Sequence, residues 1–378
     1  MKKHLAVLFI TLLLAVSCKK GQSLNTPPAT AVTNTVKYAG GLQIYRYTGY
    51  SIIKVTQPWP GADKKYTYII QKKDAEIPDS LKQYTTIQLP LKNIIVTSTT
   101  HIPSLEMLGV EPTLKGFPGT DYVSSEKTRK LIDTGHITEV GANESLNTEV
   151  IIDLDPDVIV AFAVDGSNKS LAALERSGLK VLYNGDWTEQ SPLGKAEWIK
   201  FFGVLYGMED KADSIFSGIE SEYLTAKKLA ENTTTKPTVL AGAIYQDQWY
   251  LPQGNSWGAL FIKDAGGHYL WDDTQGTGSL NLSFETVLDK AQNADFWIGP
   301  GQFTSFSEME ENNPHYNQFK AFKSRNVYSY SIKKGATGGL LYYELAPNRP
   351  DLVLKDLIHI LHPELLPNWK NRFFDQLN

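Results

Sequence analysis

The sequence has one cysteine among its 378 residues, Cys18, so the chain forms no internal disulfide. Positive charge is not in excess either, because 37 Lys and Arg face 41 Asp and Glu, for a formal net charge of −4. This balance gives no electrostatic reason to bind nucleic acid. Beyond the first residues, no run of about 18 apolar residues indicates a membrane span. A Walker loop and a Gly-x-Gly-x-x-Gly motif are also missing, so nucleotide hydrolysis is expected only in a separate subunit.

What is present is typical of a globular protein. Hydrophobic residues make up 42% of the chain and aromatic residues 11%. This composition excludes a disordered, collagenous or coiled-coil chain, and the length predicts two or three compact bodies.

Residues 1–17 have the features of an export signal. Lys2 and Lys3 precede Leu5 to Val16, an apolar stretch too short to cross a bilayer. The sole cysteine follows at once, and this order resembles a bacterial lipoprotein signal, which implies a lipid on Cys18. The alternative is ordinary cleavage, which would release a protein with a free thiol.

The residues after Cys18 predict a tether and then a folded body in the cell envelope. Residues 18–36 are rich in Thr and Pro and contain little that packs, which favours a flexible linker. We therefore expect a body in the periplasm or outside the plasma membrane, attached to the membrane by its lipid alone.

The body divides by pattern into several segments. Residues 37–92 alternate apolar and polar positions, with a β-hairpin loop at 60–63, and form a β-rich elaboration of the first lobe. Short apolar strands and helical patterns then alternate over 93–208 and 232–378. This alternation predicts an α/β fold of two lobes with central, mainly parallel sheets flanked by helices.

A weak internal repeat supports a chain of two lobes that share the same arrangement of elements. Residues 146–160 and 282–298 each read as a short helix, a turn, an aspartate and a buried strand, with Glu149 and Glu285 at matching places. Between the lobes, apolar residues recur on one helical face from Glu209 to Glu231, which predicts one long connecting helix.

Two lobes joined in this way leave a cleft at the carboxyl ends of their strands. Residues 98–101 of the first lobe and 245–250 of the second are expected to line it.

At this level the sequence resembles the substrate-binding proteins of iron-chelate and cobalamin ABC importers, over about residues 93 to 366. The resemblance rests on five short segments in the family's order: residues 98–109, 147–160, 192–198, 265–267 and 349–352. It implies a helical-backbone periplasmic binding fold with no enzymatic activity. It also implies a monomer whose partners are an ABC permease with its ATPase subunits.

The resemblance gives Glu149 and Glu285 the family's docking role, in which one glutamate on each lobe enters an arginine pocket of the permease. The alternative is that each carboxylate merely favours the dipole of its own helix, with Asn147 or Ser283 as the cap.

The expected ligand is a ferric siderophore, haem or cobalamin, and no intrinsic cofactor is expected. Flat aromatic faces suit such ligands, although most Trp and Tyr side chains lie in cores. Arg349 is expected to meet an anionic chelate, or else to brace the helix start at Pro350. The predicted ligand-binding residues are Thr99, Thr100, His101, Trp187, Tyr245, Trp249, Trp257 and Arg349.

Two other functions remain open from the sequence. A metal-ion receptor of the same fold class would use His101, but the seven histidines include no His-x-His or His-x-x-x-His pair, so no metal site is predicted. A serine hydrolase would use Ser256, because residues 254–258 fit the pattern Gly-x-Ser-x-Gly. That pattern is common by chance, and no distant acid and histidine pair accompanies it.

Overall fold

A five-stranded parallel sheet forms the centre of the first lobe in the computed structural model, which describes residues 32–378. Its order is β11-β10-β5-β6-β7, from β5 (Ile94–Val96), β6 (Leu114–Phe117), β7 (Thr138–Glu139), β10 (Val158–Ala161) and β11 (Val181–Tyr183). On β5, Ile94 and Val96 pack into one hydrophobic cluster and Ile95 into another. Burial on both faces explains why these strands are continuously apolar.

Helices surround this sheet, and several begin where the sequence supplies a cap. Ser125 and Asn147 each accept a hydrogen bond from a first-turn N–H, those of Thr128 and Val150. The helices are α1 (His101–Leu108), α2 (Glu126–Asp133), α3 (Thr148–Asp153), α4 (Lys169–Arg176), α5 (Pro192–Glu197) and α6 (Ile199–Leu205). Short 3-10 helices lie at Asp79–Leu81, Glu111–Thr113, Thr120–Tyr122, Asp186–Thr188 and Pro314–Gln318.

Residues before β5 form a four-stranded sheet that belongs to the same core. Its strands are β1 (Leu42–Arg46), β2 (Tyr50–Val55), β3 (Tyr66–Gln71) and β4 (Thr85–Gln88). β2 and β3 pair antiparallel, as a hairpin with its loop near residues 60–63 requires. Ile44 and Ile53 pack into the cluster that holds Ile94, so this sheet extends the first lobe instead of folding apart from it.

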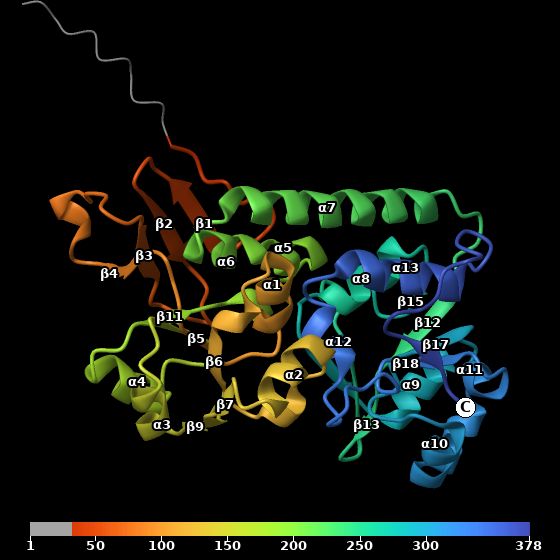
Figure 1. The fold of residues 1–378 in the computed structure, drawn as a ribbon. Coiled ribbons are helices and arrows are strands. Elements are labelled where there is room, and N and C mark those ends of the chain that lie inside the picture. The colour runs from red at the N-terminus through yellow and green to blue at the C-terminus, as the bar shows by residue number, and fades with distance from the viewer. Residues whose placement is uncertain (1–31) are drawn as a thin grey trace, which may run out of the picture. The chain divides into compact units, whose positions relative to one another are not determined.

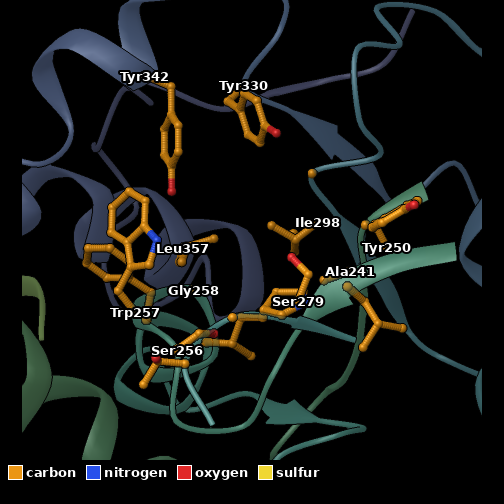
Figure 2. A pocket seen from close by; sticks show the side chains of 18 of the residues that line it. Ala241, Tyr250, Ser256, Trp257, Gly258, Ser279, Ile298, Tyr330, Tyr342 and Leu357 are labelled. Carbon is orange, nitrogen blue, oxygen red and sulfur yellow. The ribbon is translucent and has the colours of Figure 1, made fainter. Parts of the chain in front are cut away.

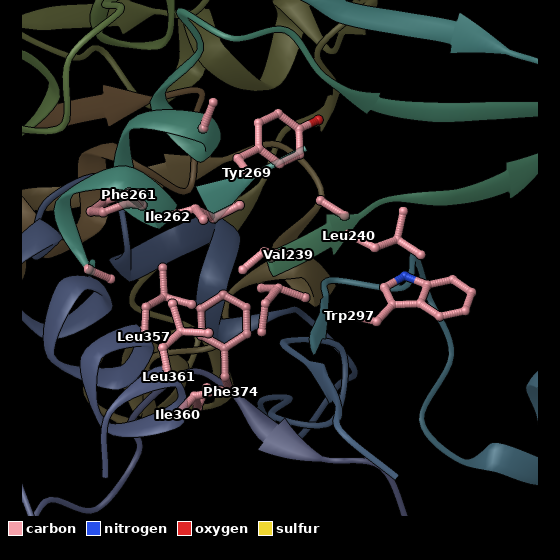
Figure 3. Packing of buried hydrophobic residues seen from close by; sticks show 14 of the residues in the cluster. Val239, Leu240, Phe261, Ile262, Tyr269, Trp297, Leu357, Ile360, Leu361 and Phe374 are labelled. Carbon is pink, nitrogen blue, oxygen red and sulfur yellow. The ribbon is translucent and has the colours of Figure 1, made fainter. Parts of the chain in front are cut away.

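The second lobe repeats the plan of the first. Its sheet has the order β15-β12-β17-β18-β19, from β12 (Thr238–Ala241), β15 (His268–Tyr269), β17 (Phe296–Ile298), β18 (Val327–Ser329) and β19 (Asp375–Gln376). Only β19 runs antiparallel to its neighbour in this sheet. Figure 3 shows Val239 of β12 on the side of Leu357 and Phe374, with Leu240 on the side of Trp297.

Further short elements complete the second lobe. They are α8 (Trp257–Asp264), α9 (Phe284–Ala291), α10 (Phe306–Asn312), α11 (Lys320–Lys323), α12 (Leu341–Leu345) and α13 (Pro350–Leu361). A small sheet pairs β13 (Ala243–Tyr245), β14 (Gln248–Pro252) and β16 (Ser279–Leu282), while β8 (Gly141–Ala142) and β9 (Ser145–Leu146) pair in the first lobe.

One helix, α7 (Glu209–Glu231), joins the lobes over the residues that the sequence predicted. It packs on α6 of the first lobe and α13 of the second, and Figure 1 shows it running past both. Phe216 and Ile219 lie in the first-lobe cluster, whereas Tyr223 and Ala226 lie in the second-lobe cluster. The buried stripe of α7 therefore contributes to both cores.

Over the described residues, 32–378, no helix is both long and apolar enough to cross a bilayer. The predicted signal 1–17, Cys18 and most of the tether fall outside the described residues.

Candidate functional site

The carboxyl ends of first-lobe strands and loop residues of the second lobe line one cavity of about 480 Å³. Thr97, Ser98 and Thr99 follow β5, and Phe162 follows β10. The second lobe contributes Gln302, residues 338–340 before α12, and Tyr343 within α12. We call this space the interlobe cavity, and it lies where open α/β sheets place their ligands.

A second cavity, of about 430 Å³, lies within the second lobe and is lined by the carboxyl end of β12, by β17 and by the helices α8 and α12. Figure 2 shows Trp257, Tyr330 and Tyr342 along its wall. Tyr330 stacks on Tyr342 with ring centroids 4.6 Å apart, and Trp257 lies 5.8 Å from the Tyr342 ring. We call this space the aromatic cavity.

The two cavities share Tyr343, whose side chain is 47% exposed and whose hydroxyl lies 3.2 Å from that of Tyr330. Tyr343 therefore borders both cavities.

Uncharged side chains line both cavities. Within the described part of the chain, no Asp, Glu, Lys, Arg or His contributes to either lining. Burial raises the pKa of Tyr330 and of Tyr342, so their hydroxyls stay protonated at physiological pH. The site thus offers aromatic faces, hydroxyls and amides but no fixed charge to a ligand.

Direct hydrogen bonds join the lobes beside the interlobe cavity. The Asn348 amide donates to the Thr100 carbonyl oxygen at 2.7 Å, and Ser104 donates to the Asn348 Oδ1 at 2.8 Å. The Glu344 carboxylate of α12 accepts the backbone N–H groups of Ser124 at 2.6 Å and Ser125 at 3.0 Å.

A glycine allows the closest approach between the lobes. A Cβ at Gly339 would collide with the Tyr122 carbonyl oxygen. The backbones of the two lobes can meet here only because this position has no side chain.

Among the predicted first-lobe residues, Thr99 lines the interlobe cavity and Thr100 does not, since its hydroxyl donates to Asp186 at 2.6 Å. Trp187 lies behind the wall, with its ring 5.5 Å from that of Phe162, which does line the cavity.

The expectation that His101 contacts a ligand is wrong. Its side chain is completely buried, with its ring centroid 5.5 Å from that of Phe202. Burial lowers the pKa of His101 to about 4, against the opposing charge of Asp186. A metal-ion receptor built on His101 is therefore not supported. Over residues 32–378, no group of three or more His, Cys, Asp or Glu is placed to hold a metal ion.

Trp249 is a core residue, and the prediction that it binds ligand is also wrong. Its ring is fully buried and stacks on Trp297 with centroids 5.1 Å apart, and its indole N–H donates to the Ala241 carbonyl at 3.0 Å. Tyr245 is 65% exposed on the β13–β14 hairpin and lines neither cavity. Trp257 does line the aromatic cavity.

Arg349 pairs with a carboxylate of its own helix, α13, instead of facing a cavity. Its guanidinium donates to both oxygens of Asp351, at 2.9 and 2.7 Å, and it lines neither cavity. The expected contact with an anionic chelate is therefore wrong. The pair of Arg349 with Asp351 fits the alternative, a role at the start of the helix at Pro350.

Ser256 is the N-cap of α8, where its Oγ accepts the Ala259 N–H at 3.3 Å. Its backbone, at φ −72° and ψ 156°, has none of the strain of a nucleophile elbow. The Gly-x-Ser-x-Gly match is thus explained by helix capping.

Glu149 and Glu285 lie at equivalent places in the two lobes. Each is exposed in the first turn of its helix, α3 or α9, behind a cap formed by Asn147 or Ser283. Neither carboxylate forms an ion pair within the described residues.

Sequence reasoning missed the aromatic residues of the C-terminal region. Tyr330, Tyr342 and Tyr343 were not predicted, although Gly338 and Gly339 followed closely by two tyrosines were a signal for a close approach. Tyr122, 72% exposed at the interlobe cavity, was also missed.

Comparison with known proteins identifies the family of this chain. A family model described as "periplasmic binding protein" matches residues 94–332, more than half of the chain. An uncharacterized lipoprotein of Methanocaldococcus jannaschii is 29% identical over 370 residues, covering 92% of this chain and 86% of that protein.

Solved structures share the fold. A periplasmic heme binding protein from Pseudomonas aeruginosa aligns with a TM-score of 0.57 and 17% identity, over 76% of this chain and 99% of that one. A possible iron-binding, periplasmic solute-binding protein from Staphylococcus epidermidis aligns with a TM-score of 0.55 and 20% identity, over 72% and 99%.

Proposed function

Because the chain belongs to the periplasmic binding protein family, which consists of binding proteins and not enzymes, we propose that it is the receptor of an ABC importer. In this proposal it holds a ferric siderophore, haem or cobalamin in the cleft between its lobes. It then delivers the ligand, as a monomer, to a permease with its ATPase subunits.

One observation carries the proposal: cavities lined by aromatic rings, hydroxyls and amides lie at the facing strand ends of two lobes. Sites for large organic ligands are mostly apolar, with a few polar groups that fix orientation. The names of two structural relatives, a heme binding protein and a possible iron-binding protein, point the same way.

We also propose that Cys18 carries a lipid and that the Thr- and Pro-rich residues after it tether the body to the membrane. The position of the sole cysteine after an apolar leader supports this, as does a relative named a lipoprotein. A Cys18→Ala variant should leave the membrane fraction for the soluble fraction of the envelope. Retention of that variant in the membrane would contradict the anchor.

A fluorescence titration tests the ligand class. The purified protein is titrated with haem, cobalamin and a panel of ferric siderophores, and one of these should quench its tryptophans saturably. Trp257→Phe should reduce the amplitude of the quenching, because Trp257 lines the aromatic cavity. Tyr343→Ala should weaken binding, because Tyr343 borders both cavities.

The matched control is Trp249→Phe, which changes a buried ring outside both linings and should leave ligand affinity unaltered. Saturable binding by none of these ligands would overturn the proposed function. Equal effects of Trp249→Phe and Trp257→Phe would mean that the ligand lies elsewhere.

A further inference from the structure

Lys195 is a buried lysine of the first lobe, and no salt bridge within residues 32–378 includes it. It lies on α5 and is 8% exposed. Its ammonium donates to two backbone carbonyl oxygens, that of Asp186 at 3.3 Å and that of Trp187 at 2.9 Å. Buried lysines are almost always paired with an acid, because an unpaired ammonium loses its hydration without compensation. The position of Lys195 therefore calls for a further interaction.

Two carboxylates lie near Lys195, but other groups already donate to them. The Asp186 carboxylate accepts the Thr100 hydroxyl at 2.6 Å. Glu189 accepts the backbone N–H of Gly41 at 2.9 Å. Burial lowers the pKa of Lys195, against the opposing charges of Asp186 and Glu189. Because neither carboxylate is within ion-pair distance, their charges favour the ammonium form but do not fix its direction.

The ammonium of Lys195 faces an aromatic ring across the boundary between the lobes. Its Nζ lies 5.2 Å from the ring centroid of Trp257, the first residue of α8 in the second lobe. The helices α5 and α8 pack on each other, which brings the two side chains together. A cation is attracted to the face of an indole ring, and the attraction is stronger where water is excluded.

Trp257 is also a wall residue of the aromatic cavity, where it lies beside Tyr342 (Figure 2). The planes of these two rings are 30° from parallel, and Tyr342 in turn stacks on Tyr330. Trp257 is only partly buried, so core packing encloses its ring in part. The ammonium of Lys195 supplies a contact from the first lobe that the second lobe does not provide.

We infer that Lys195 is a positioning residue of the binding site: from the first lobe it holds Trp257 in the orientation that forms the wall of the aromatic cavity in the second lobe. This inference rests on the proposed function and adds to it a residue that lines neither cavity. A ligand that contacts Trp257 then meets a ring that is already ordered, which spares the cost of fixing that side chain on binding.

Fluorine NMR of the purified protein labelled with 5-fluorotryptophan tests the positioning role without any ligand. The sequence has eight tryptophans, and the resonance of Trp257 is the one that Trp257→Phe lacks. Lys195→Met keeps the length of the side chain and removes its charge, so it should displace the Trp257 resonance by more than its linewidth. Lys195→Arg keeps a cation and should bring the resonance back towards its position in the unaltered protein.

The matched control is Lys263→Met, which removes an exposed lysine from α8 itself. Lys263 has no ion pair within residues 32–378, and its replacement should leave the Trp257 resonance unchanged. Trp187 is set aside, because Lys195 bonds to its backbone. The other six tryptophans should keep their resonances, which shows that each variant is folded.

A second measurement uses the unaltered protein, in case Lys195→Met does not fold. Between about pH 7 and about pH 10 the loss of the Lys195 proton should displace the Trp257 resonance. Lys195→Arg should lack this displacement, because a guanidinium stays charged over that range.

Titration with haem, cobalamin and the ferric siderophores measures the effect on binding. For the compound that binds, Lys195→Met should weaken the affinity by roughly twofold to tenfold, the cost of ordering one side chain. Lys195→Arg should stay within about twofold of the unaltered protein.

An unmoved Trp257 resonance in folded Lys195→Met protein would overturn the inference. If that variant does not fold, a Trp257 resonance that is independent of pH in the unaltered protein would do so. Equal displacement in the Met and Arg variants would overturn the role of the charge, and an unchanged affinity in Lys195→Met would overturn the link to binding. Binding of none of the compounds would overturn the proposed function, whereas the NMR result would still decide what holds Trp257, so the two failures are distinguishable.

Discussion

Trp249 and Trp257 lie eight residues apart, and their backbones give them opposite roles. On β14 the side chains alternate, so Trp249 and Leu251 point into the core while Tyr250 stays exposed. Trp257 begins α8 and is only partly buried, at the wall of a cavity. Composition alone marks both as aromatic, and only their placement on elements separates a core ring from a contact ring.

Trp249→Ala should destabilise the protein by about 3–5 kcal/mol, because it removes a buried ring from a stack with Trp297 and leaves a cavity. Urea unfolding at neutral pH measures the change in the free energy of unfolding. Tyr245→Ala, on the exposed hairpin tip, is the control and should change it by less than about 0.5 kcal/mol. A similarly small loss in the free energy of unfolding for both variants would contradict the placement of Trp249 in the core.

His101 makes stability sensitive to acid. Burial holds its pKa at about 4 in the folded state, below the usual value of 6.5, so unfolded chains bind a proton more readily. The folded state therefore loses stability as pH falls from about 6.5 towards 4, by about 3 kcal/mol in all. A His101→Leu variant should lack this loss.

Urea unfolding of the wild type and of His101→Leu at pH 7.0 and pH 4.5 measures the difference. Between the two pH values, the free energy of unfolding of the wild type should fall by about 2–3 kcal/mol relative to that of the variant. Parallel pH profiles of the two proteins would show that His101 does not carry the effect.

At the scale of elements, the sequence predicted the helices and strands that depend on interactions between nearby residues. The 23 residues of α7 were found from a periodic stripe, and the short strands of both sheets from their apolar runs. Near the end of this helix, Leu229 is 36% exposed, while Ala230 is buried. At the helix end the buried face therefore continues from Ala226 to Ala230, four residues on, and does not include Leu229.

The segment from Gly335 to Glu344 escaped prediction because its conformation depends on the opposite lobe. Gly335 and Gly339 approach the backbone of residues 122–124, more than 200 positions earlier in the chain. No periodicity in a single segment encodes such a contact. For the same reason the cavity-lining tyrosines of α12 were missed, whereas Thr99, next to a predicted strand end, does line the interlobe cavity.

Glu344, at the contact of α12 with the first lobe, should make the free energy of unfolding fall as pH rises. Burial, with the nearby charge of Glu106 as a lesser cause, raises the pKa of Glu344 to about 7, so the folded state favours its protonated form. Its stabilising contribution is therefore fully present below about pH 4.5 and is lost as pH rises through 7. Between pH 5 and pH 8 the loss amounts to about 2–3 kcal/mol.

Glu344→Gln should remove this dependence, since an amide keeps the side-chain size and does not titrate. Relative to this variant, the wild type should become less stable by that amount from pH 5 to pH 8, as measured by urea unfolding. Glu310→Gln, at an exposed site on α10, is the control, and its stability should depend on pH as that of the wild type does. A wild-type profile parallel to that of Glu344→Gln would refute the assignment.

For the whole molecule, the shared helix restricts how the lobes move. Because α7 is buried in both cores, the lobes cannot separate far without exposing apolar surface of one of them. We expect ligand to change the radius of gyration in X-ray scattering by less than about 1–2 Å, the scale of small helix shifts. A larger change would mean that α7 bends or detaches.

Because closure is limited, we propose that a permease recognises this protein mainly through its surface, at the matching glutamates of the two lobes. Glu149 and Glu285 are exposed at equivalent helix starts, with no ion pair in residues 32–378. Two separated carboxylates fix both position and orientation on a partner that offers two basic pockets. One carboxylate alone fixes only position.

Each single change, Glu149→Ala or Glu285→Ala, should therefore reduce ligand uptake by roughly tenfold, and the double variant should abolish it. Ligand affinity should be unaltered in all three, because neither glutamate lines a cavity. Uptake of labelled ligand by cells carrying the importer, together with titration of the purified variants, measures both quantities. Glu231→Ala with Glu310→Ala removes two other exposed carboxylates and should leave uptake intact. If that control lost uptake equally, overall negative charge and not the paired glutamates would direct docking.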